Sequence, residues 1–173
     1  MNEIYRPHKL PTATQAAEGL PRRRWTTAEL EAAAKLGLFI DTRGNDERFE
    51  LIGGEVVPMS PKGNRHEIVR TMVTQYFYRC IGHEKLIIAS EPQFNLAPDE
   101  YTQPDILVFP EPLLVPDVRG SDALLVVEVA DSSLNYDLTT KAPLYASFGV
   151  REYWVIDPRD QTVQRCQGAA RNR

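Results

Sequence analysis

Apolar residues recur about every 3.6 positions between residues 64 and 81, which predicts one long amphipathic helix. Asn64 and Glu67 form a capping pattern at its start, and Gly82 stands where the helix should end. The apolar positions are Ile68, Val69, Met72, Val73, Tyr76, Phe77, Cys80 and Ile81. We expect this wide stripe to hold the helix flat against a sheet.

Two shorter helices are predicted on either side of it. Thr26 and Glu29 make a capping box at the start of the first helix, which continues through the alanine-rich residues 30–36. Residues 131–136 form a polar loop, and the second helix follows this loop and ends near Gly149.

Alternating apolar and polar positions predict the strands. Residues 48–52 and 55–59 flank Gly53-Gly54, a pair that favours a tight hairpin turn. Residues 123–129 are apolar on both faces, which is typical of a central strand covered on both sides. The other predicted strands are residues 86–90, 93–96, 105–109, 150–156 and 162–166.

The order of these elements predicts an α/β (α+β) fold with one central mixed β-sheet flanked by α-helices. A chain of 173 residues suits a single domain, which we expect over residues 25–173. Residues 1–24 contain three prolines and no apolar period, so we expect them to form a flexible N-terminal arm.

The charge balance limits the possible functions. With 20 basic and 24 acidic residues the net charge is −4, which argues against a protein that coats nucleic acid through bulk positive charge. No apolar run approaches the ~18 residues of a membrane span, so no membrane partner is expected. The N-terminus has no secretory pattern and the two cysteines lack metal-ligand spacing, which predicts a cytoplasmic protein with reduced thiols.

Glu128 is the residue that points most clearly to chemistry. A carboxylate in the apolar run of residues 124–129 is costly to bury unless a cation, a metal ion or a proton balances it. A glutamate that reaches solvent or pairs with an arginine would also explain the pattern. Asp105 begins the strand at residues 105–109, and two acids at the ends of neighbouring strands would suit a hard cation such as Mg²⁺.

Lys141 is a candidate third member of this site. It lies thirteen residues after Glu128, with Asp137 and Tyr145 four residues away on either side. The spacing fits an ordinary ion pair between Asp137 and Lys141, and it equally fits a lysine that orients water or stabilises a transition state at a metal site. Pro143 requires the helix either to begin near Lys141 or to kink there.

Several motifs follow one another in an order that is more specific than any one of them. They are Gly53-Gly54-Glu55 and the run to Pro61, His66, Gln103-Pro104-Asp105-Ile106, residues 127–133, the set Asp137, Lys141 and Tyr145, and residues 149–157. Over roughly residues 22–166 this series resembles the Uma-type putative restriction endonuclease family, a branch of the PD-(D/E)xK nuclease superfamily.

The resemblance implies a restriction-endonuclease-like domain with a site for Mg²⁺ or Mn²⁺ at one end of its sheet. It implies that Asp105 and Glu128 are catalytic metal ligands and that Lys141 is the catalytic lysine, with Tyr145 as a further catalytic residue that backs it with a hydroxyl. The superfamily usually has its lysine two residues after the second acid, where this chain has Ala130. Glu55 and His66 are further residues that the resemblance suggests for the cleft.

Two functions remain open from the sequence. One is a metal-dependent endonuclease that hydrolyses phosphodiester bonds in DNA. The other is a catalytically silent nuclease fold that serves as a binding or assembly module. A homodimer is expected in either case, since such domains commonly form two-fold assemblies.

Overall fold

The computed structural model describes residues 23–41, 43–81 and 85–167 of the chain. All but residues 23 and 24 of the predicted N-terminal arm, together with the predicted helix stop at Gly82, lie outside this part. The helices are α2 (Thr27–Lys35), α3 (Asn64–Ile81), α4 (Leu134–Tyr136) and α5 (Ala142–Ser147), with a π-helical turn at Asp137–Lys141 and 3₁₀ turns at Val115–Asp117 and Gly120–Asp122.

The larger sheet has five strands in the order β3-β6-β7-β8-β9. Their bounds are β3 (Leu86–Ser90), β6 (Ile106–Pro110), β7 (Leu125–Val129), β8 (Glu152–Asp157) and β9 (Thr162–Gln167). Strands β7 and β8 are parallel and the other neighbours are antiparallel, so the sheet is mixed as predicted. Strand β7 lies at its centre, which confirms the interpretation of the doubly apolar run at residues 123–129.

A second sheet of four antiparallel strands, in the order β2-β1-β5-β4, was not predicted. Its strands are β1 (Phe49–Ile52), β2 (Glu55–Pro58), β4 (Phe94–Ala97) and β5 (Glu100–Thr102). The Gly53-Gly54 turn joins β1 to β2 with both glycines at positive φ, which confirms the predicted hairpin. Strand β5 has only three residues, too few for an alternating pattern to reveal it.

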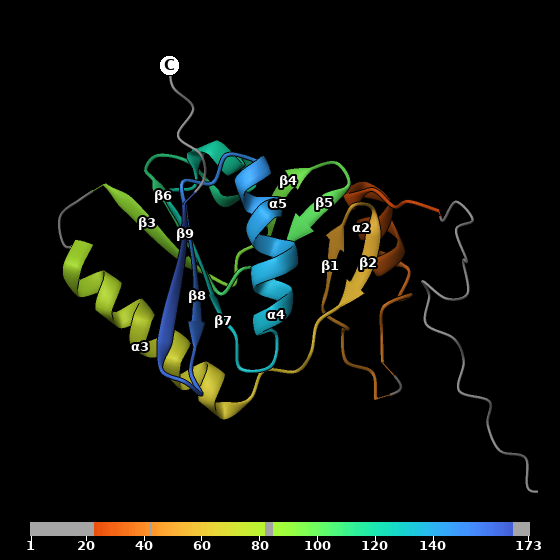
Figure 1. The fold of residues 1–173 in the computed structure, drawn as a ribbon. Helices are drawn as coiled ribbons and strands as arrows, with labels where there is room; N and C mark the ends of the chain where they lie inside the picture. The colour runs from red at the N-terminus through yellow and green to blue at the C-terminus, as the bar shows by residue number, and fades with distance from the viewer. Residues whose placement is uncertain (1–22, 42, 82–84, 168–173) are drawn as a thin grey trace, which may run out of the picture.

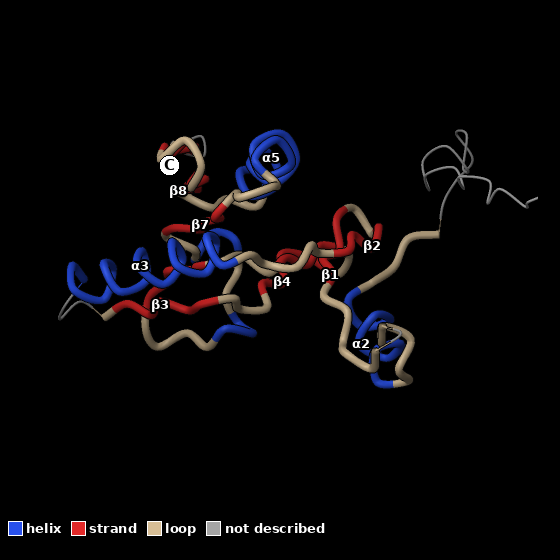
Figure 2. The backbone as a smooth tube through the Cα atoms, turned by 90° about the horizontal axis from the view of Figure 1, so that it is seen from below, coloured by secondary structure: helices blue, strands red, loops and turns tan. Residues whose placement is uncertain are grey.

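The long helix α3 and the helical segment α4–α5 cover opposite faces of the larger sheet (Figure 2). The apolar line of α3 that contacts this sheet consists of Val69, Val73, Phe77 and Ile81. The other half of the predicted stripe faces outward, with Ile68, Met72 and Tyr76 59%, 63% and 63% exposed. The stripe was therefore predicted too wide, because only the line of residues directly above the sheet is covered.

The segment from α4 to α5 runs between the two sheets and carries Lys141. In Figure 1 the β1–β2 hairpin and α2 lie to the right of this segment, while β3, β8 and β9 lie to the left. Pro143 comes just after the π-helical turn, in which the amide of Ala142 donates to the carbonyl of Asp137. A π turn is wider than an α turn, and this widening accommodates the proline ring without ending the helix.

Helix α2 begins with the predicted capping box, since Thr26 accepts a hydrogen bond from the Glu29 amide and Glu29 accepts one from the Thr26 amide. Among the described residues no helix is both long and apolar enough to cross a membrane. Cys80 is exposed and Cys166 is half-buried, and both are free thiols.

Candidate functional site

Three acidic residues meet at one end of the strands of the larger sheet because of the strand register. Strand β6 is antiparallel to β3 and to β7, so the start of β6 lies beside the ends of both neighbours. Asp105 immediately precedes β6, Glu91 immediately follows β3, and Glu128 is the penultimate residue of β7. The Asp105 amide nitrogen lies 3.3 Å from Glu128 Oε2, and the Glu91 amide donates to the Asp105 carbonyl at 3.1 Å.

Glu128 lies on the central strand β7 and is only 5% exposed. Its Oε1 accepts hydrogen bonds from Lys141 Nζ at 2.9 Å and from the Tyr145 hydroxyl at 3.4 Å. Burial raises the pKa of Glu128 well above its usual value; the charge of Lys141 opposes this shift, and the charges of Asp105, Asp137 and Glu50 add to it. Additional positive charge near Glu128 would stabilise its ionised form.

Lys141 is shared among three carboxylates and is 4% exposed. Its Nζ lies 2.9 Å from Glu50 Oε1, 2.9 Å from Glu128 Oε1 and 3.8 Å from Asp137 Oδ1. Burial alone lowers the pKa of Lys141, but the charge of Glu128 and the other acids outweighs it and raises the pKa well above the usual value. The ammonium thus stays charged across the physiological range.

Asp105 is buried with a hydrogen-bond donor on each oxygen. Its Oδ2 accepts from the Val129 amide at 2.8 Å and lies 2.9 Å from His66 Nε2, while Oδ1 lies 2.5 Å from Lys62 Nζ. Burial raises the pKa of Asp105, but the His66 hydrogen bond and the Lys62 charge outweigh it and lower the pKa to about 2. Asp105 is therefore ionised at neutral pH, and the pKa values of the two acids are shifted in opposite directions.

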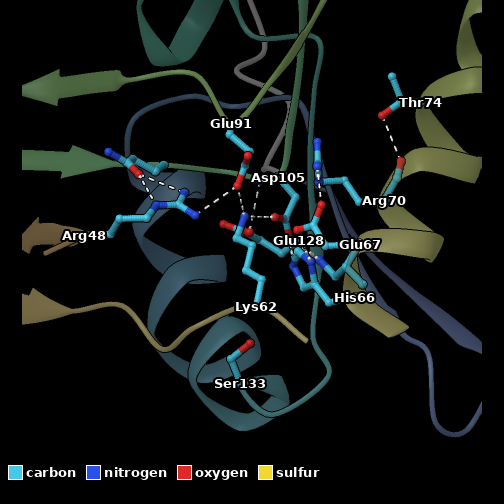
Figure 3. A network of polar contacts seen from close by, with 12 residues as sticks. Arg48, Lys62, His66, Glu67, Arg70, Thr74, Glu91, Asp105, Glu128 and Ser133 are labelled. Atoms are coloured by element: carbon cyan, nitrogen blue, oxygen red, sulfur yellow. Dashed lines mark hydrogen bonds and ion pairs between the residues drawn. The ribbon is translucent and has the colours of Figure 1, made fainter. Parts of the chain in front are cut away.

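An ion-pair network extends from Asp105 to the protein surface (Figure 3). Lys62 also lies 2.5 Å from Glu91 Oε1, and Arg48 Nη1 approaches the same oxygen at 3.1 Å. Arg48 is 40% exposed at its side chain, whereas Lys62 is 12% exposed. Two cations thus flank Glu91, and one of them is shared with Asp105.

An open cavity of about 460 Å³ lies in front of the buried carboxylates, between the two sheets. The acidic residues of its wall are Glu50, Asp105, Glu128, Asp131 and Asp137, and its basic residues are Lys62, His66 and Lys141. The remaining lining residues come from β2, the β2–α3 segment, the end of β7 with the loop after it, and α4. The cavity gives a substrate access to the buried carboxylates from solvent.

The structure brings together five of the six residues that the sequence suggested for the site. Asp105, Glu128, Lys141 and His66 line the cavity, and Tyr145 lies behind Glu128 with no exposed surface. Glu55 is exposed in β2, next to the hairpin turn, and is not among the lining residues.

Sequence reasoning missed Glu50 and Lys62. Glu50 is a buried acid between the apolar residues Phe49 and Leu51, a signal of the same kind as that of Glu128. Lys62 lies in the segment between β2 and α3, and no local pattern distinguishes it from a solvated lysine.

Asp105 and Glu128 are the two carboxylates of adjacent strands that could hold a hard cation. No group of three His, Cys, Asp or Glu side chains in the described ranges is arranged to hold an ion alone. Mg²⁺ commonly binds through only one or two protein carboxylates, with water and substrate oxygens completing its coordination.

Comparison with known proteins agrees with this architecture. The family model described as Uma2, putative restriction endonuclease, matches residues 32–172. No curated protein matches the chain. The crystal structure of a putative nuclease belonging to DUF820 from Anabaena variabilis ATCC 29413 is similar, with a TM-score of 0.60 and 19% identity over 70% of this chain and 72% of that one. At this identity the likeness shows a shared fold, which is restriction-endonuclease-like. Because the family model covers most of the sequence, the chain belongs to the Uma2 family of putative restriction endonucleases.

Proposed function

We propose that the protein is a divalent-metal-dependent endonuclease that hydrolyses phosphodiester bonds in DNA, with Asp105 and Glu128 as ligands of Mg²⁺ or Mn²⁺. The observation that carries the proposal is that these two buried carboxylates lie together at the ends of neighbouring strands. Lys141 Nζ lies 2.9 Å from Glu128, and both carboxylates line the cavity. Family membership gives independent support for a nuclease.

The charges of the site fit a divalent cation. Five carboxylates line the cavity against two lysines and one histidine, so acidic groups outnumber basic ones. Burial raises the pKa of Glu128, and the charges of the surrounding acids add to this shift, so added positive charge would stabilise the ionised carboxylate. A divalent ion would supply that charge and offset the repulsion between the carboxylates.

Each residue then has a separate part in the reaction. Lys141 keeps Glu128 in place and presents an ammonium at the cavity wall, where it can orient water or donate to a phosphoryl oxygen. His66 and the Val129 amide hold Asp105 in one orientation. Tyr145 is a positioning residue, because it is buried behind Glu128 and cannot touch a substrate. When bound, the ion supplies the Lewis acidity that activates water and stabilises the departing oxygen.

The cavity rim offers positive charge to a phosphate backbone such as that of DNA. Arg65 and Arg159 both pair with Asp131, which lines the cavity, at 3.4 Å and 3.0 Å. The two arginine side chains are 57% and 60% exposed, so one carboxylate faces two cations next to the opening. This excess positive charge suits the phosphates that flank a scissile bond.

The direct test is cleavage of supercoiled plasmid with Mg²⁺ or Mn²⁺. We expect wild type to nick or linearise the plasmid, and Asp105→Asn and Glu128→Gln to lose at least ~10³-fold in rate because each removes a charged ligand. Glu55→Gln is a matched control, since Glu55 is an exposed acid outside the cavity. Activity that survives both site substitutions would refute the assignment of the site.

A catalytically silent binding module is the second candidate, and one observation favours it. Every oxygen of Asp105 and Glu128 already has a donor within 3.4 Å, so each carboxylate oxygen has a partner within the protein. This alternative predicts intact plasmid with either ion and no calorimetric binding of Mn²⁺.

A further inference from the structure

The β2–α3 segment contributes an ammonium to the acidic site at the place where a metal ion would approach. Lys62 Nζ lies 2.5 Å from Asp105 Oδ1, and its side chain is 12% exposed (Figure 3). The Lys62 contact accounts for part of the lowered pKa of Asp105. None of the roles assigned above uses this lysine.

The two oxygens of Asp105 differ in what they can still accept. Oδ2 receives the Val129 amide at 2.8 Å and His66 at 2.9 Å, which uses both of its lone pairs. Among the described residues, Oδ1 is paired with Lys62 alone. Oδ1 is therefore the oxygen that remains for a cation, and Lys62 occupies it.

Lys62 has a second carboxylate within reach, because Glu91 Oε1 is also 2.5 Å from Nζ. Glu91 immediately follows β3 and lies beside Asp105, which precedes the neighbouring strand β6. Arg48 Nη1 forms an ion pair with Glu91 Oε1 at 3.1 Å. A lysine that gives up Asp105 would thus remain ion-paired instead of being left buried without a partner, which would be costly. Its four-carbon stem allows such a shift without movement of the backbone.

Resting on the proposed metal site, we propose that Lys62 is an internal counter-cation that holds Asp105 in the metal-free protein and passes to Glu91 when a divalent cation binds. The metal affinity then reflects a competition between the ammonium and the ion for Asp105 Oδ1. Lys62 sets the ion concentration at which the site fills, and it keeps the acidic site paired at low concentrations.

Calorimetric titration with Mn²⁺, which needs no substrate, tests this exchange. Lys62→Met removes the competitor, and we expect it to bind Mn²⁺ about tenfold more tightly than wild type, or better. Lys62→Arg retains the charge and should stay within about threefold of wild type. Lys85→Met is the matched control, because Lys85 is exposed at the opposite end of β3 and should leave the affinity unchanged.

Glu91→Gln tests the acceptor. It should weaken Mn²⁺ binding in wild type, where Lys62 would then rest on Asp105 alone, and have little effect in the Lys62→Met background. An equal loss in both backgrounds would show that Glu91 attracts the ion directly and would overturn the exchange.

The outcomes separate this inference from the function on which it rests. Wild-type binding that Lys62→Met leaves unchanged or weakens would overturn the role of Lys62 alone. Absence of Mn²⁺ binding in wild type and in all variants would overturn the metal site and the exchange together. Thermal unfolding of each variant establishes that the titrated protein is folded.

Discussion

Replacing Lys141 with methionine removes the ammonium that three buried carboxylates share, while nearly conserving side-chain volume. Two of the contacts are 2.9 Å, and each corresponds to roughly 6 kcal/mol of attraction at an effective dielectric constant of about 20. The cost of burying the ions offsets much of this, and removal of one partner from a buried pair typically costs about 3–5 kcal/mol. Lys141→Met should therefore lose about that much unfolding free energy.

The loss should depend on pH in a direction fixed by Glu128. Burial raises the pKa of this acid above its ordinary value of 4.5, and removing Lys141 raises it further. An acid whose folded-state pKa lies above the unfolded value favours folding at pH below the unfolded pKa, and this contribution disappears as the pH rises through the folded pKa. The variant should therefore lose more stability at pH 8 than at pH 5.

Urea denaturation in the presence of EDTA, at both pH values, measures the effect without any metal contribution. Lys35→Met is the control, because Lys35 is exposed at the end of α2 and should change stability by less than about 0.5 kcal/mol. Glu128→Gln in the Lys141→Met background should restore part of the loss. A loss below about 1 kcal/mol that is the same at both pH values would refute this account of the buried charges.

Three further variants, two single and one double, test the surroundings of the site. Tyr145→Phe removes a 3.4 Å hydrogen bond to the acid of β7 and should cost about 0.5–1.5 kcal/mol in urea denaturation, with less than tenfold loss of cleavage rate. Gly54→Ala should cost at least ~1 kcal/mol, because φ is 75° and a Cβ would lie 2.7 Å from Arg24 Cβ. Replacing both Arg65 and Arg159 with glutamine should weaken DNA binding. It should also make the slope of log affinity against log salt concentration shallower by about 2.

Contrary results would be informative for each substitution. A Tyr145→Phe protein that cleaves at least ~10³-fold more slowly would mean that the hydroxyl takes part in the reaction. Unchanged stability of Gly54→Ala would contradict the close approach of the hairpin turn to Arg24. The control for the arginine pair is the double variant Arg43→Gln and Arg119→Gln, since both arginines are exposed and outside the cavity. If the two double variants gave the same salt slope, the arginines of the rim would not belong to the DNA interface.

Much of the site could be predicted because its main acids interrupt apolar patterns. A charged residue in a strand that is apolar on both faces must be balanced, and this identified Glu128 before its partners were known. Asp105 followed because its strand begins beside the end of the Glu128 strand. The hairpin at Gly53-Gly54 and the bounds of α3 were predictable because they depend on local turn and helix preferences.

The remainder depends on contacts between segments distant in the sequence. Glu50 reaches Lys141 from the second sheet, and that sheet is completed by the three-residue strand β5. Lys62 reaches Asp105 across 43 positions in the sequence. The outward face of α3 depends on how much of the helix the sheet covers, which periodicity along one segment cannot reveal. The homodimer stays a prediction.

Anomalous scattering from crystals soaked in Mn²⁺ tests the central claim most directly. The account predicts one anomalous peak in the cavity, within about 2.0–2.6 Å of carboxylate oxygens of both Asp105 and Glu128, and absent from Glu128→Gln crystals. The same maps would show whether Lys62 has moved to Glu91. A cavity without a peak in wild-type crystals, or a peak that contacts neither carboxylate, would contradict the proposed metal site.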